Sequence, residues 1–275
     1  MAGGQAVPAI ALLLLPLVSG AAAQAVPNRT TLYLYPTDVT DTRALWVNPA
    51  GLPRMMEASV HLDVTVGEPG AGGRLRQMTA GLSSRGFSLG YQRDVFDGGV
   101  RSHTYRFGFA TGKRRLSAGA ATALYRGARG SSGTGWNFGI VYALTPTLTL
   151  GAVVANLGRP VARDSVLRVV STPGATLRLF DRRAVLSADA GVTTDGVAGY
   201  AFGIVGVLRQ GTRLPLRILA RLDTDRSLRR AGFAFGLSVG GQDLFGAVAT
   251  TPGDLGRVAA VSLYGVSTRS LTHTR

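Results

Sequence analysis

Two short patterns in the sequence carry residue types that could perform chemistry. Ser238 stands at the centre of a Gly-x-Ser-x-Gly motif, the spacing of a hydrolase nucleophile. That motif needs a helix after the serine and acid and histidine partners further along the chain. Here residues 244–250 continue as another strand pattern, and the only later histidine is His273. Residues 108–113 (GFATGK) resemble half of a phosphate loop, but they lack a hydroxyl residue after the lysine and a helix pattern behind it. We therefore expect no enzymatic activity.

The histidines and acidic residues suggest no metal centre. His61 and Asp63 share one face of an extended stretch and would need a third ligand, yet the chain has three scattered histidines and no cysteine. These residues make no recognisable ligand set, so neither a metal nor another cofactor is predicted. The lack of cysteine also excludes a disulfide framework.

Composition points to strands that contact something apolar. Hydrophobic residues make up 45% of the chain and charged residues 16%, and the 38 glycines are scattered through apolar runs. An average soluble protein has about 25% charged residues. The formal net charge of +15 comes from arginines in short clusters between apolar stretches. No motif that combines aromatic and basic residues accompanies them, so nucleic acid is not an expected partner.

A central stretch, residues 135–158 (GWNFGIVYALTPTLTLGAVVANLG), predicts a β-hairpin that turns at Pro146. Large apolar side chains recur with a period of two, which places them on one face of each strand. Pairing Tyr142 with Leu148 keeps these side chains together, while the opposite face carries mainly Gly, Ala, Val and Thr. A soluble sandwich needs charged or long polar side chains on its outer face. The hairpin instead suits a transmembrane barrel, in which large apolar residues face lipid and small ones face the interior.

The N-terminus has the features of an export signal. Residues 9–18 (AIALLLLPLV) form an apolar core, and Ala21-Ala22-Ala23 supplies a small-residue cleavage site, so residues 1–23 are predicted to be a cleaved signal peptide. No later stretch has the length of a membrane-spanning apolar helix. A membrane location would therefore require a barrel.

The same alternation recurs from residue 54 to residue 267. Tyr105, Phe107 and Phe109, for example, alternate with Thr104, Arg106 and Gly108. We count about 12 to 14 such segments of roughly 8 to 11 residues, the length that a tilted strand needs to cross a bilayer. The sequence thus predicts an all-β protein that forms one antiparallel transmembrane barrel, with residues 268–275 as a C-terminal tail.

A short motif lies between the signal peptide and the first strand pattern. The phrase NPAGL follows small and aromatic residues and resembles the N-terminal motif of FadL-type outer-membrane transporters and of the PorV and PorQ group. That resemblance implies that residues 24–53 fold into the barrel as a plug or hatch. The motif residues are Asn48, Pro49, Ala50, Gly51 and Leu52.

A sparse set of charged residues falls on the face expected to line the lumen. They would either cross-link the interior and hold the plug, or line a path for a substrate with an anionic head group, because Arg facing lipid at mid-membrane costs about 2 to 4 kcal/mol. These residues are Asp63, Arg106, Asp189, Arg217, Arg221 and Asp223.

The sequence and the resemblance together predict a barrel in the bacterial outer membrane, surrounded by lipid and lipopolysaccharide. The resemblance implies passive transport of hydrophobic small molecules. One alternative is a non-transporting barrel that serves as the anchor or partner of a secretion or protease apparatus. Another is an exported soluble β-rich binding module.

Overall fold

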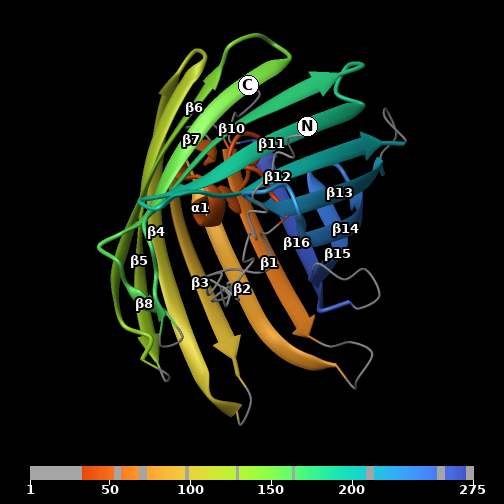
Figure 1. Cartoon of the computed structure of the whole chain (residues 1–275). Coiled ribbons are helices and arrows are strands. Elements are labelled where there is room, and N and C mark those ends of the chain that lie inside the picture. Colours follow the sequence, from red (N-terminus) through yellow and green to blue (C-terminus); the bar gives the residue numbers. More distant parts are fainter. Residues whose placement is uncertain are drawn as a thin grey trace, which may run out of the picture.

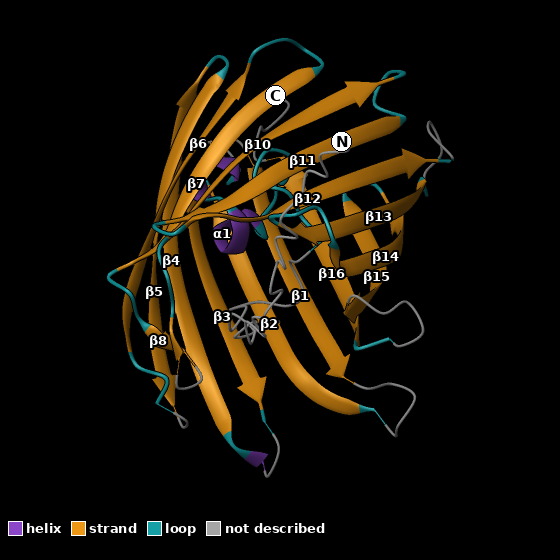
Figure 2. Ribbon diagram, viewed as in Figure 1, coloured by secondary structure: helices purple, strands orange, loops and turns teal. Residues whose placement is uncertain are grey.

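Long antiparallel strands form a closed barrel in the computed structural model, which describes residues 33–52, 57–67, 73–96, 99–127, 130–162, 165–208, 214–252 and 258–270. The predicted signal peptide lies outside these residues. Figure 1 shows the barrel with a short helix, α1 (Ala44–Val47), inside it, and Figure 2 shows that strands make up nearly all of the wall. Within the described ranges, no helix has the length and apolar character needed to cross a membrane.

The barrel contains 14 strands among the described residues, at the upper end of the predicted number. Each strand pairs with its neighbour in the chain, apart from β7 with β10 and the closing pair β1 with β16. The strands are β1 (Glu57–Gly67), β2 (Arg74–Ser84), β3 (Phe87–Val95), β4 (Arg101–Lys113), β5 (Leu116–Gly127), β6 (Gly133–Ala143), β7 (Leu148–Leu157), β10 (Val170–Leu179), β11 (Ala184–Thr193), β12 (Gly196–Val207), β13 (Leu216–Asp225), β14 (Arg230–Gly240), β15 (Asp243–Pro252) and β16 (Ala260–Ser270).

The alternation of residue types separates the two faces of the wall. On β4, Phe107 and Phe109 are exposed, whereas Thr104 and Arg106 between the outward positions are buried. The same contrast holds on β6, where Trp136 and its outward neighbours are exposed. A sheet that closes on itself has no free edge, and its outer band of apolar side chains needs an apolar surrounding. The predicted fold class is therefore confirmed.

The two ends of the barrel differ in their connections. Glu57 pairs with Ser270, so the first strand begins beside the end of the last one. Connections at this end include the two-residue turns Arg85-Gly86 and Gly241-Gln242. Positive φ angles at Arg85 (49°) and Gly86 (82°) match a tight turn between twisted strands. Most connections at the opposite end are longer, as is usual for the extracellular end of such barrels.

The central hairpin forms as predicted, but in a different register. Tyr142 pairs with Leu150 rather than with Leu148, so the predicted pairing was wrong by two residues. The turn explains the difference. The Thr145 hydroxyl accepts the backbone N–H of Leu148 at 2.9 Å, and the Thr145 N–H donates to the Leu148 carbonyl at 3.1 Å, so Leu148, the first residue of β7, is held against Thr145 rather than opposite Tyr142. A shift of two residues preserves the faces of both strands.

Candidate functional site

Residues 33–52, which we call the lumen segment, fold against the inner face of the barrel. They contain α1 and a short 3-10 helix, η2 (Pro49–Gly51). Asn48 joins the two helices and is fully buried. Its side-chain oxygen accepts the Ala50 N–H at 3.0 Å, and its amide group donates to the Pro36 carbonyl at 2.9 Å. The residues of the NPAGL motif therefore fix the fold of the segment by capping η2 and tying it back to an earlier turn.

A track of inner-face glycines receives the lumen segment. A Cβ atom at Gly119 would lie 2.6 Å from the Ala50 nitrogen, and one at Gly108 would lie 2.5 Å from a methyl group of Leu45. At Gly139 an added Cβ would overlap the side chain of Asn48. Only residues without side chains allow this approach. The inner-face glycines that touch the segment are Gly90, Gly108, Gly119, Gly139, Gly151 and Gly203.

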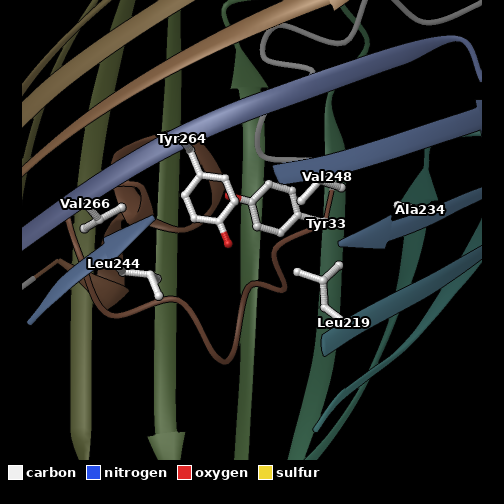
Figure 3. Packing of buried hydrophobic residues seen from close by; sticks show 7 residues of the cluster. All are labelled: Tyr33, Leu219, Ala234, Leu244, Val248, Tyr264 and Val266. Atoms are coloured by element: carbon white, nitrogen blue, oxygen red, sulfur yellow. The ribbon is translucent and has the colours of Figure 1, made fainter. Parts of the chain in front are cut away.

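Arg43 is the centre of a buried polar contact between the lumen segment and the last strand. Its guanidinium bonds Asp41 at 2.7 Å and the Tyr33 hydroxyl at 2.8 Å, and it lies 5.0 Å from the ring centre of Tyr264 on β16. Tyr33 and Tyr264 stack with their ring centres 5.3 Å apart, and Figure 3 shows both rings in a cluster with Leu219.

Burial and neighbouring charges shift the pKa values of Asp41 and Arg43 in opposite directions. Burial alone would raise the pKa of the Asp41 carboxyl, but the adjacent Arg43 guanidinium lowers that pKa below its ordinary value. Burial likewise opposes the charge of Arg43, yet Asp41 and Tyr33 hold the pKa of Arg43 well above its usual range. Burial raises the pKa of the Tyr33 hydroxyl, which stays neutral. Arg43 and Asp41 therefore stay ionised as a pair inside the barrel.

Arginines of the wall also hold the lumen segment by its backbone carbonyl groups. Arg106 on β4 donates to the Leu45 carbonyl at 3.2 Å and lies 4.9 Å from the Trp46 ring. On the opposite side of the lumen segment, Arg221 on β13 donates to the Leu34 carbonyl at 3.1 Å and lies 4.8 Å from the Tyr35 ring. The segment is thus fastened to two distant parts of the wall.

The six charged residues expected on the inner face occupy different surroundings. Arg221 and Asp223 form an ion pair of 2.8 Å, and Asp189 lies on the inner face of β11. Arg217 also lies on the inner face of β13, nearer the strand's start, where it pairs with Ser238.

Asp63 is fully buried on β1, 3.5 Å from His61. The six residues therefore form two groups on different parts of the wall. Asp63 and Arg106 lie on β1 and β4, and the other four lie on β11 and β13, so the charges do not form one continuous ring.

Two further anchors were missed in the sequence. Arg178 on β10 bonds Asp38 of the lumen segment at 2.8 Å, and Thr176 on the same strand exchanges a hydrogen bond of 2.6 Å with Thr37. A signal for both existed, because Leu177 and Leu179 continue the outward alternation and place residues 176 and 178 on the inner face.

The long connection between β7 and β10 covers part of the lumen at the end of the barrel away from Glu57 and Ser270. It contains the short strands β8 (Val161–Ala162) and β9 (Ser165–Val166), and Val161 bridges to Ser132. Ala162 and Leu167 pack against Ala123 and Tyr125 from the inner face of β5. This connection therefore folds inward instead of extending from the barrel.

The other chemical patterns have structural surroundings. Ser238 lies buried on the inner face of β14, and β15 follows this strand after a two-residue turn where a hydrolase has a helix. His103 lies on the outer face of the wall and His61 on the inner face, so these two cannot share a metal. Across the parts of the chain that the structure describes, no cluster of three or more His, Cys, Asp or Glu residues could hold a metal ion.

The fold and the inner segment together define a class: a 14-strand barrel of the outer-membrane type with an N-terminal segment in its lumen. Several solved structures are similar to the chain. CymD, a monoaromatic hydrocarbon channel, matches with a TM-score of 0.54 and 14% identity over 86% of this chain and 94% of its own. A mutant of TodX, also a monoaromatic hydrocarbon channel, matches with a TM-score of 0.51 and 12% identity over 82% and 93%.

A FadL homologue from Pseudomonas aeruginosa matches with a TM-score of 0.50 and 11% identity, over 86% of this chain and 96% of its own. No protein-family model and no curated protein matches the sequence. At these identities the comparisons establish the fold, which is that of FadL-type barrels. These neighbours are channels rather than enzymes. The similarity to the PorV and PorQ group remains a prediction.

Proposed function

We propose that this chain spans the bacterial outer membrane and lets hydrophobic small molecules pass, with the lumen segment as the hatch that controls the path. The observation that carries the proposal is the track of inner-face glycines, which holds a folded segment across the lumen. An ordinary structural core gains nothing from a glycine-lined wall, because glycine contributes no side chain to packing. The fold it shares with two monoaromatic hydrocarbon channels supports this choice of substrate class.

The outer face of the barrel supports the membrane location. Phe87 is 71% exposed and Phe109 53%, and they are paired neighbours on β3 and β4. Aromatic side chains in such a band would be costly in water, since each buries 150 to 250 Å² when it is covered. Exposed rings on adjacent strands also argue against the soluble binding module.

A non-transporting barrel is the second candidate, and the tight fit of the lumen segment favours it. An added Cβ at Gly119 or Gly139 would collide with the segment, and Arg43 is buried together with Tyr33 and Tyr264. A lumen filled in this way suits an anchor or partner of a larger apparatus. The two candidates differ in whether the segment must move for the protein to work.

A reversible lock on the lumen segment tests the choice. The chain has no cysteine, and the hydroxyl oxygens of Thr37 and Thr176 are 2.6 Å apart, so T37C/T176C places one thiol on the segment and one on β10. We expect cells with the reduced variant in their outer membrane to take up a labelled monoaromatic hydrocarbon. Oxidation to the disulfide should lower uptake to the level of cells without the barrel, and reduction should restore it.

The single variants T37C and T176C are the controls, because oxidation leaves each of them unlocked. Uptake that is the same with and without the barrel, in every redox state, would reject transport and leave the anchor as the better function. Recovery of the protein in the soluble fraction without detergent would reject the membrane location itself.

A further inference from the structure

A row of basic side chains stands on the outer face of the barrel. Arg93 on β3 pairs with His103 on β4, and His103 pairs with Arg126 on β5, so the three lie side by side on adjacent strands. Arg101, two residues before His103, faces the same way. These four residues are the basic row. Their outward direction follows from Phe107, which has the same parity on β4 and is 46% exposed.

The basic row lies at the height expected of a membrane boundary. The strand from His103 to Lys113 rises about 33 Å at about 3.3 Å per residue. At a tilt of about 40° this spans about 25 Å across the membrane, the height of the apolar band of such barrels. Tyr91 and Tyr105 lie beside the row on its membrane side, with ring centres 5.4 Å apart, and the Tyr91 hydroxyl bonds the His103 Nδ1 at 2.7 Å. Aromatic residues with polar tips are typical of this boundary.

No acidic side chain of the described residues neutralises the row. Arg93 and Arg101 make no ion pair within the described ranges, and Arg126 donates only to the neighbouring Tyr125 carbonyl. The nearest carboxylate along β3, Asp94, is buried on the inner face, where it accepts a hydrogen bond from Gln77 at 2.8 Å.

Two exposed arginines elsewhere on the barrel, Arg168 and Arg269, have acidic partners. Arg168 bonds Asp195 and Arg269 bonds Asp243, each at 2.8 Å. Arg93 and Arg126 flank His103 on its two neighbouring strands, so the guanidinium groups of two arginines stand on either side of one position. Among the residues that the structure describes, the basic row therefore lacks the counter-charge that Arg168 and Arg269 have.

We propose that the basic row binds the phosphorylated head group of a lipid in the leaflet at the end of the barrel with the longer connections. Guanidinium groups bind phosphate oxygens through paired, charge-assisted hydrogen bonds. Basic residues at the membrane boundary are a recurrent means of holding lipid head groups. The acyl chains of such a lipid would lie along Leu89 and Phe107 below the row. This inference rests on the proposed membrane location and is independent of transport.

Native mass spectrometry of the full-length barrel in detergent tests the proposal. The probes are a lipid with a phosphomonoester head group, the same lipid after enzymatic removal of its phosphate, and inorganic phosphate. We expect the phosphorylated lipid to bind and its dephosphorylated form to bind weakly. In R93Q/R101Q/R126Q the affinity should fall about a hundredfold, because each charge removed near the membrane surface weakens attraction about fivefold.

The matched control is R226Q/R229Q/R230Q, which removes three exposed arginines at the same end of the barrel, around the turn between β13 and β14. The affinity of this control for the phosphorylated lipid should stay within a factor of two of that of the unmodified protein. Should the triple variant of the row fail to fold, as judged by heat-modifiable gel mobility, R126Q alone and the charge-preserving R126K provide the comparison. Arg126 is exposed, so both should fold.

Equal affinity of the row variant and the parent would overturn the proposal. So would equal binding of the phosphorylated and dephosphorylated lipids. Displacement of the lipid by inorganic phosphate at similar concentration would make the row a site for free anions and reject the lipid. A membrane-embedded barrel that gives any of these results would still be compatible with transport, whereas a freely soluble protein would reject the proposed function instead.

Discussion

Replacing Gly119 with alanine should loosen the lumen segment. The new methyl group would lie 2.5 Å from the Pro49 carbonyl carbon and 2.6 Å from the Ala50 nitrogen, both of them backbone atoms. Non-bonded atoms prefer about 3.5 Å or more, so η2 must move by roughly 1 Å. The hydrogen bonds of Asn48 resist this movement. Overpacking of this kind costs about 1 to 3 kcal/mol.

Thiol labelling measures this loss. Thr42 is fully buried in the lumen segment, and T42C supplies the only thiol in a chain without cysteine. If the thiol reacts only when the segment leaves the wall, a cost of 1 to 3 kcal/mol raises the labelling rate about 5- to 150-fold. We expect this increase for folded G119A/T42C relative to T42C alone.

G191A is the matched control. Gly191 also lies on the inner face of a strand, but its added Cβ would meet no atom closer than 3.9 Å. The labelling rate of G191A/T42C should equal that of T42C. If G119A and G191A gave the same rate, the packing of η2 on β5 would not hold the segment in place, and the argument from the glycine track would be refuted.

Three further results are expected. In W136F, where Trp46 is the remaining tryptophan, acrylamide quenching should stay constant from pH 7 down to about 4 and rise below the ordinary carboxyl pKa of 3.8. The reason is that a lowered pKa of Asp41 stabilises the folded segment at pH values above 3.8, and this stabilisation is lost as the pH falls through the folded-state pKa of Asp41. D41N should lack this transition. An identical quenching curve for D41N would exclude Asp41 as its cause. R106M should lower the free energy of unfolding by about 2 to 4 kcal/mol, the sum of a charge-assisted hydrogen bond and a ring contact, as measured by urea titration in liposomes; a change below about 0.5 kcal/mol would contradict the anchoring role of Arg106. In the same assay F138R should cost about 2 to 4 kcal/mol and F138L less than about 1.5 kcal/mol; equal losses would mean that Phe138 does not face lipid.

The wall of the barrel was predictable because its signal is local. Alternation along β4 is enough to place Phe107 outside and Arg106 inside, and the same rule applied to each strand gives the class of fold. The register in which neighbouring strands pair was harder to predict from the sequence. The pairing of Tyr142 depends on how the Thr145 side chain closes the turn, and a proline in the loop says little about that geometry.

The candidate site was predictable only in part because its contacts are distant in the chain. The NPAGL motif predicts a segment inside the barrel, and the structure places that segment against the inner wall. Nothing local distinguishes Gly119, which touches Ala50, from Gly191, which touches nothing nearby. The difference arises when strands far apart in sequence close around the segment. Arg178 was missed for a simpler reason, since its position on the inner face could have been derived from its neighbours.

The stacked pair Tyr33 and Tyr264 constrains the order of assembly. Tyr264 belongs to β16, the last strand to be synthesised, whereas the contacts of Leu45 and Ala50 are with β3, β4 and β5. The segment can therefore dock on the early strands while the sheet is still open, but its contact with Tyr264 must wait for the final strand. The contact of Arg43 with Tyr264 therefore forms only once β16, the strand that closes the barrel against β1, is in place. A barrel that closes without its segment would have to admit the segment through one of its ends.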